Sequence, residues 1–128
     1  MPLEINIKRQ IDSRKHTALI VELGGSLDTA TAPQLEKQLA AALDDQVKDL
    51  IFDLAKLTFI SSAGLRIFAA ARKTMRTRGE QVSFVNLQPQ INEVFEIVKA
   101  LPGVSIFASV AEFDEYLAVR QRKIQEGE

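Results

Sequence analysis

Two adjacent hydroxyl groups, those of Ser61 and Ser62, stand where the apolar segment 50–60 gives way to a second apolar segment with the spacing of a helix. A helix N-terminus presents backbone N–H groups without intrahelical partners and a partial positive charge. A phosphate group on either serine would be tolerated electrostatically at such a position. On residue type alone, the two serines are most simply N-cap residues, and capping is compatible with phosphorylation. The pair therefore indicates a helix cap, a modification site, or both.

Three further residues, Gly64, Asp28 and Asp53, have structural interpretations, and Gly64 also has a functional one. Gly64 falls in the first turn of the expected helix, where glycine costs about 1 kcal/mol relative to alanine. Either a partner such as a kinase approaches the backbone there, or the helix packs closely on the sheet. Asp28, in a turn that follows Gly24-Gly25, is typical of an Asx turn or a helix entry. Asp53 is expected to end a strand and to accept hydrogen bonds from loop amides.

The chain lacks the residue patterns of the enzymes that its serines and glycines could suggest. A serine hydrolase needs a base beside its nucleophile, but the one histidine, His16, falls in an expected hairpin turn. The segment 61–64 differs from the Gly-x-Ser-x-Gly elbow. Gly24-Gly25 lacks the Walker spacing and lysine, and no Gly-x-Gly-x-x-Gly occurs. We therefore expect the substrate of an enzyme rather than an enzyme.

Composition limits the class of protein and of partner. The chain has 128 residues, 46% of them hydrophobic and 26% charged, which fits one soluble globular domain. The formal net charge of −1 gives no overall attraction for nucleic acid or an anionic membrane. The basic cluster in 72–78 fits the last turn of a helix, where cations are favoured. We expect no nucleic-acid or membrane partner.

Cysteine usage and the N-terminal residues indicate the compartment. The absence of cysteine excludes disulfides and thiolate metal sites. The carboxylates show no metal-binding spacing, so we expect neither a metal nor a cofactor. No segment has the pattern of a signal peptide or the length of a membrane span. These features favour a cytoplasmic protein.

Strands and helices alternate after an N-terminal hairpin, which predicts an α/β fold with right-handed crossovers and a mostly parallel sheet. The strand 50–54 is nearly continuous in apolar residues and should be central. We expect a single domain over residues 1–118 and a charged helix end or tail over 119–128. The other expected strands cover 3–7, 18–23, 82–85 and 104–107, and the expected helices cover 31–43, 65–78, 91–98 and 113–124. Gly24-Gly25 should end the strand 18–23, and residues 101–103 should end the helix 91–98. Capping boxes are expected at Thr31 and Gln34 and at Ser109 and Glu112.

The segment Asp53–Arg66 resembles the phosphorylation-site motif of the anti-sigma factor antagonists, the bacterial members of the STAS family. The segment Leu23–Leu35 is similar to the second signature of that family, a glycine and Leu-Asp turn that leads into a helix with an Ala-Pro start. In the commoner form of the first motif, Asp-Ser-Ser/Thr-Gly-Leu, the first serine accepts the phosphate. Aligned on this chain, Ser61 takes the Asp position, Ser62 is the phosphoacceptor and Ala63 takes the second hydroxyl position; Ser61 is an adjacent alternative.

The resemblance implies a small STAS-like domain with a mixed sheet and about four helices packed on it, and it implies a partner switch. The unphosphorylated chain, a monomer when free, would bind an anti-sigma factor that is also a serine kinase of the histidine-kinase-like ATPase type. Phosphorylation of Ser62 would break that complex, and a PP2C-type phosphatase would restore it. The open alternatives are a STAS-type interaction or small-ligand module without serine phosphorylation and, as a third class, a hydrolase. The implied partner-binding residues are Asp28, whose charge would shape the site, Thr29, Ser61, Ser62, Ala63, Gly64 and Arg66.

Overall fold

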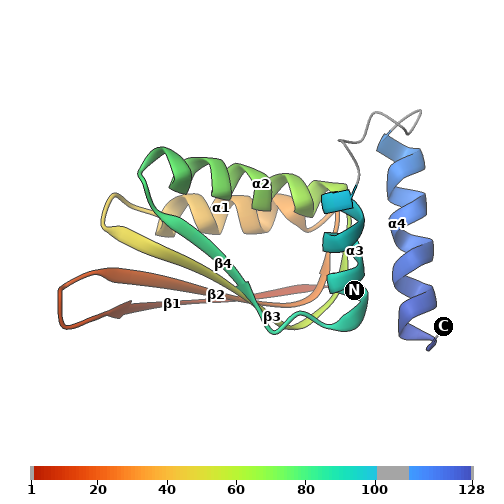
Figure 1. Cartoon of the computed structure of the whole chain (residues 1–128), viewed down its shortest axis with the longest axis horizontal. Coiled ribbons are helices and arrows are strands. Elements are labelled where there is room, and N and C mark those ends of the chain that lie inside the picture. The colour runs from red at the N-terminus through yellow and green to blue at the C-terminus, as the bar shows by residue number, and fades with distance from the viewer. Residues whose placement is uncertain (1, 101–109, 128) are drawn as a thin grey trace.

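A four-stranded sheet in the order β1-β2-β3-β4 lies at the centre of the computed structural model, which describes residues 2–100 and 110–127 (Figure 1). The strands β1 and β2 form an antiparallel hairpin, whereas β2, β3 and β4 run parallel. The predicted α/β class, the N-terminal hairpin and the central place of the strand that contains residues 50–54 are confirmed. The strands are β1 (Leu3–Ile11), β2 (Thr17–Leu27), β3 (Val47–Ile60) and β4 (Gln81–Val85).

Two helices cover one face of this sheet, and two stand at one end of it. In Figure 1, α1 and α2 lie side by side over the strands, while α3 and α4 stand upright beside the sheet. Within the described ranges, no helix combines the length and the apolar character that a membrane crossing requires. The helices are α1 (Ala32–Ala42), α2 (Ser62–Thr77), α3 (Pro89–Ala100) and α4 (Val110–Gln125).

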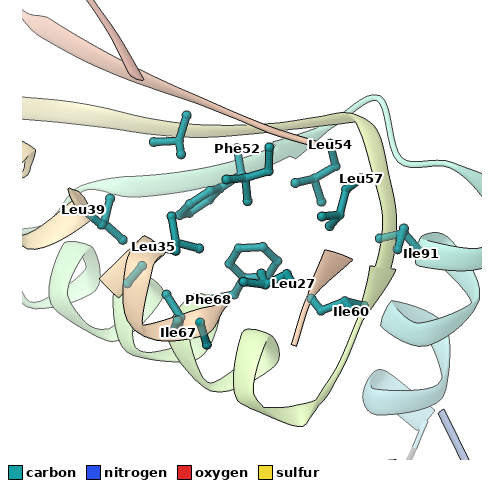
Figure 2. Packing of buried hydrophobic residues seen from close by; sticks show 14 of the residues in the cluster. Leu27, Leu35, Leu39, Phe52, Leu54, Leu57, Ile60, Ile67, Phe68 and Ile91 are labelled. Atoms are coloured by element: carbon teal, nitrogen blue, oxygen red, sulfur yellow. The ribbon is translucent and has the colours of Figure 1, made fainter. Parts of the chain in front are cut away.

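The core lies between the sheet and the pair α1 and α2. Alternation along β3 places Leu50, Phe52 and Leu54 on the helix side, and all three are fully buried. Figure 2 shows Phe52 close to Phe68 of α2, and their ring centroids are 4.8 Å apart. Phe84 of β4 stacks on Phe52 at 5.4 Å. This aromatic cluster fixes α2 over the central strand.

Three predicted strand ends are wrong. The strand β1 continues past residue 7 to Ile11, where it still pairs with β2. The strand β2 continues through Gly24-Gly25 to Leu27, because the two glycines accommodate register shifts against β3 instead of breaking the strand. Gly25 has a positive φ of 85°, and a Cβ there would collide with the carbonyl oxygen of Pro2. The strand β3 likewise continues past Asp53 to Ile60.

Asp53 nevertheless accepts a backbone N–H, that of Ala55 at 3.1 Å, but Ala55 belongs to β3 rather than to the predicted loop. It also accepts the side-chain amide of Asn86 at 3.2 Å. The Thr31 and Gln34 capping box is wrong: the Thr31 side chain makes no cap bond, and the Gln34 amide donates to the carbonyl of Leu3 at 3.4 Å. The helix α2 ends at Thr77, before the positive-φ residue Gly79. The predicted strand 104–107, the helix end at 101–103 and the Ser109 cap lie outside the described residues.

Candidate functional site

The carboxyl ends of β2 and β3 lie next to each other, and this arrangement forms the candidate site. Leu27 pairs with Ile60 in the parallel register, and the N–H of Ser61 donates to the carbonyl of Leu27 at 2.9 Å. The turn that begins at Asp28 therefore lies beside the start of α2. Two segments that are distant in the sequence, and that sequence analysis singled out separately, meet at one edge of the sheet.

The turn before α1 is held by the carboxylate of Asp28. One of its oxygens accepts the backbone N–H groups of Ala30 and Thr31, each at 3.0 Å. The Thr31 hydroxyl accepts the N–H of Asp28 at 2.9 Å and donates to the carbonyl of Ser26 at 2.8 Å. The Asx-turn interpretation of Asp28 is thus confirmed, and the network holds the exposed Thr29 at the tip of a rigid turn.

Both serines lie at the helix start, but neither side chain caps the helix. Ser61 is the N-cap residue with extended backbone, and Ser62 is the first residue of α2. The residues are only 6% and 8% exposed, and each Oγ is buried without a hydrogen-bond partner among the described residues. The side-chain capping role suggested by residue type is therefore wrong. Unpartnered buried hydroxyls are unusual in proteins, so this pair calls for an explanation.

The cap of α2 comes from α4 instead. Asp114 Oδ1 accepts the backbone N–H of Ser62 at 2.7 Å, a short, charge-assisted bond. The first turn of α2 has no acidic residue of its own, so Asp114 supplies the negative charge that a helix N-terminus favours. Asp114 was not predicted as a site residue, because 52 positions separate the partners and nothing in the sequence links them.

A second polar residue of α4 binds the end of β3. Gln121 is 1% exposed; its Oε1 accepts the N–H of Ile60 at 2.8 Å, and its Nε2 donates to the carbonyl of Ile60 at 2.7 Å. The helix α4 continues without interruption through residue 118, the predicted end of the domain. The contact of Gln121 therefore lies in the segment 119–128, which was predicted as a charged helix end or tail. Asp114, the buried Leu117 and Gln121 recur at spacings of three and four, so one face of α4 lies over the junction between β3 and α2.

Gly64 faces the core. A Cβ at this position would lie 2.6 Å from Leu27 Cγ and 2.9 Å from Ile60 Cγ1, closer than ordinary contact distance. The structure therefore favours close packing of α2 on the strand ends over the approach of a partner to the Gly64 backbone. The α2 side chain that reaches solvent in this region is Arg66, one turn after Ser62.

A groove of ≈ 540 Å³ runs between α1 and α2 beside the strand ends. Three predicted site residues, Thr29, Ala63 and Arg66, line it, whereas Asp28, Ser61, Ser62 and Gly64 do not. The α1 side of the groove was not predicted; the available signal was small side chains that recur about two turns apart, at Ala32 and Ala40 and at Ala63 and Ala70. The further lining residues include Pro33, Glu36, Ala40 and Ala70.

The described residues contain no group of three or more His, Cys, Asp or Glu side chains that could hold a metal ion. His16 precedes β2, at the opposite end of the sheet from Ser62, and its N–H donates to Asp12. The site therefore brings no histidine to the serines. It combines two buried hydroxyls, a helix N-terminus that can offset an anionic charge, and an adjoining groove.

Comparison with known proteins agrees with this geometry. The family model of the STAS domain matches residues 8–113. BtrV of Bordetella bronchiseptica, named as a candidate anti-sigma factor antagonist, is 40% identical over 79 residues, which are 62% of this chain and 68% of that protein. The anti-sigma-B factor antagonist of Staphylococcus aureus is 29% identical over 77 residues, 60% of this chain and 71% of that protein.

Solved structures show the same fold. The unphosphorylated form of the anti-sigma factor antagonist SpoIIAA matches with a TM-score of 0.56 and 18% identity, and the alignment covers 72% of this chain and 83% of that chain. The phosphorylated form of SpoIIAA, from Bacillus, matches with the same TM-score.

Proposed function

The chain belongs to the STAS domain family, and from this premise we propose that it is a cytoplasmic anti-sigma factor antagonist switched by phosphorylation of Ser62. The observation that carries the proposal is the position of Ser62. It opens α2 at the end of the central strand and has a hydroxyl without a hydrogen-bond partner among the described residues. A helix N-terminus offsets the charge of a phosphate. The names of the relatives, and a SpoIIAA structure in the phosphorylated form, support the same role.

The unphosphorylated chain would bind an anti-sigma factor that is also a serine kinase of the histidine-kinase-like ATPase type. The contact surface would be centred on the meeting point of the two strand ends. There the Asp28 turn presents Thr29, and the first turns of α2 present Ala63 and Arg66 beside the groove. Ser61, Ser62 and Gly64 belong to the same junction but are buried in this conformation.

Phosphorylation would release the partner through the cost of a misplaced charge. A phosphoserine carries about −1.5 to −2 charges at neutral pH. A buried charge left without its partner at an interface costs about 2–5 kcal/mol, or about thirtyfold to several thousandfold in affinity. A PP2C-type phosphatase would remove the phosphate and restore binding. No catalytic role for the chain is needed in this cycle.

The test is phosphate transfer from the cognate kinase with ATP and Mg²⁺. We expect Ser62→Ala to abolish labelling and the neighbouring Ser61→Ala to retain it. Peptide mapping that placed the phosphate on Ser61, or labelling that survived Ser62→Ala, would contradict the assignment. Titration of the partner with unmodified and phosphorylated protein should then show the affinity loss. Ser62→Asp is a weaker mimic, because one carboxylate has less charge and fewer acceptor oxygens.

A second candidate is a STAS-type interaction or small-ligand module that undergoes no serine phosphorylation. The groove between α1 and α2 is the observation that favours it, since the groove is lined without either serine. In that case Ser62→Ala and wild type would bind the same partner or ligand equally, and substitution in the groove, for example Ala70→Trp, would abolish binding. Unlabelled protein after kinase treatment together with these results would favour the second candidate.

A further inference from the structure

The side chain of Ser62 is not accessible in the folded chain. The residue is 8% exposed, and its Oγ is buried without a hydrogen-bond partner among the described residues. A kinase must bring the γ-phosphate of ATP into line with the attacking hydroxyl oxygen, which requires direct access to that oxygen. The conformation described here is therefore closed to modification, and some element must move before Ser62 can react.

The helix α4 is the element whose side chains hold this junction from outside α2 and β3. Asp114 accepts the N–H of Ser62 at 2.7 Å, and Gln121 binds both backbone groups of Ile60. Elsewhere α4 packs along α3 rather than on the sheet, as Figure 1 shows. Two polar contacts and the buried Leu117 between them therefore attach α4 to the junction between β3 and α2.

A phosphate on Ser62 and the carboxylate of Asp114 would compete for the same helix end. The N–H that Asp114 binds belongs to Ser62 itself, so a phosphate on that residue would stand beside the carboxylate. Both groups are anionic acceptors that favour the free N–H groups of a helix N-terminus. Their mutual repulsion would favour departure of Asp114, because the phosphate is covalently attached to α2 and Asp114 is not.

We infer that α4 is an autoinhibitory latch on the switch serine, with Asp114 as the residue that sets access to Ser62. In the latched state, Asp114 caps α2 and Gln121 holds Ile60, so Ser62 is shielded. Undocking of this face of α4 exposes Ser62 to a kinase or partner, and a phosphate then takes the place of Asp114 and keeps α4 undocked. The second half of this inference rests on the proposed function; the shielding of Ser62 does not.

Thiol labelling tests the latch without a kinase, because the chain has no cysteine and Ser62→Cys introduces a single thiol. The probe is iodoacetamide, which is small and uncharged. We expect the thiol of Ser62→Cys to react about a hundredfold more slowly than that of Ser83→Cys, an exposed position on β4, as local protection slows a reaction that requires opening. Equal rates for the two thiols would overturn the inference.

Adding Asp114→Ala to Ser62→Cys should raise the labelling rate about ten- to a hundredfold. This factor corresponds to the loss of one hydrogen bond to a charged group. Gln121→Ala is the second latch variant, should Asp114→Ala fold poorly. The matched control is Glu115→Ala, an exposed acid on the same helix, which should leave the rate unchanged. Val47→Ala, at the buried start of β3, lowers global stability without touching the latch. An unchanged rate in both latch variants, or an increase explained by their global stability alone, would refute the latch.

The phosphate step has its own test in protein made with phosphoserine incorporated at position 62 during translation. Hydrogen exchange in the segment 110–125 should become at least about tenfold faster than in the serine form, while α2 stays protected. Unchanged protection of α4 would overturn the competition between phosphate and Asp114. Because neither experiment uses a kinase, failure of a kinase to modify Ser62 would refute the proposed function and leave both results interpretable.

Discussion

Replacement of Gln121 by methionine tests whether α4 is an integral part of the fold at the strand end. Methionine preserves the length of the side chain and its helix propensity, but it removes both hydrogen bonds to Ile60. Ile60 is fully buried, and each unpaired buried backbone group costs about 1–3 kcal/mol. Partial opening of α4 would let water bind these groups and limit the loss, so we expect destabilisation of about 2–4 kcal/mol.

Urea denaturation followed by circular dichroism measures this loss. With a slope of about 1–3 kcal/mol per molar urea, the midpoint should fall by about 1–2 M. The control is Gln125→Met, one turn later on α4, where the glutamine is exposed; it should stay within about 0.5 kcal/mol of wild type. Amide exchange at Ile60 should accelerate only in Gln121→Met. Wild-type stability of Gln121→Met with unchanged exchange at Ile60 would refute the reasoning.

The variant Gln121→Glu separates the two hydrogen bonds by pH. Its carboxylate can still accept the Ile60 N–H, but only the protonated acid can donate to the Ile60 carbonyl. Burial beside a carbonyl oxygen should raise the pKa of the new carboxyl above its unfolded value of about 4.3. Because the pKa is raised in the folded state, the stabilisation of the fold by the protonated carboxyl is complete below the unfolded pKa. It is lost as the pH rises through the folded pKa. The stability deficit of Gln121→Glu should therefore shrink toward acid pH relative to Gln121→Met, and a constant difference would contradict this.

Three further results are expected. Gly64→Ala should destabilise the domain by about 1–2 kcal/mol in urea denaturation, because the new Cβ would overlap Leu27 and the gain in helix propensity offsets only part of that cost; a gain in stability would contradict the packing role. Hydrogen bonds from the N–H groups of His16 and Arg14 hold the pKa of Asp12 below its ordinary value of 3.8. The β1–β2 turn should therefore lose stability as the pH falls through the lowered pKa, which amide exchange in the turn would measure. Asp12→Asn should remove this acid-dependent step. A chelator should leave the thermal melt unchanged, since the described residues hold no candidate metal cluster, and a lower melting temperature would contradict this.

Local patterns in the sequence were sufficient to predict most elements. The apolar residues around Phe52 predicted a central strand, with a neighbouring strand on each side. The spacing after Leu65 predicted α2, with Gly79 beyond its end. Prediction failed where a residue with a local preference met a tertiary constraint. Gly24 and Gly25 are turn formers by propensity, yet β2 extends through them because the parallel register with β3 can absorb their shifts.

The position of the candidate site could be predicted from the sequence, but the contacts that α4 makes with it could not. Ser62 lies at the helix start because the end of an apolar strand and the onset of helical spacing are both local signals. Asp114 and Gln121 make their contacts across 52 and 61 positions, and polar residues on an amphipathic helix are expected to face solvent. Only the docking of α4 brings them to the strand end, and periodicity contains no information about that docking.

The presence of Asp114 changes what a phosphate on Ser62 would do to the fold. If the N-terminus of α2 were the only group that interacted with it, a phosphate on Ser62 would be stabilised by about 0.3–1 kcal/mol, and the domain should be almost unaffected. Asp114 accepts the N–H of Ser62 itself at 2.7 Å. At an illustrative separation of about 5 Å, the two anions would repel by about 3 kcal/mol per unit of phosphate charge at an effective dielectric constant of about 20. Asp114 is half-buried, so solvent reduces this figure, but with a charge near −2 it still exceeds the 1.5–3 kcal/mol of about one charged hydrogen bond. The repulsion is therefore large enough to release Asp114 yet too local to unfold α2, whose N–H groups the phosphate can bind. Phosphorylation should act on α4 and on the partner surface at once, while the core around Phe52 and Phe68 stays intact.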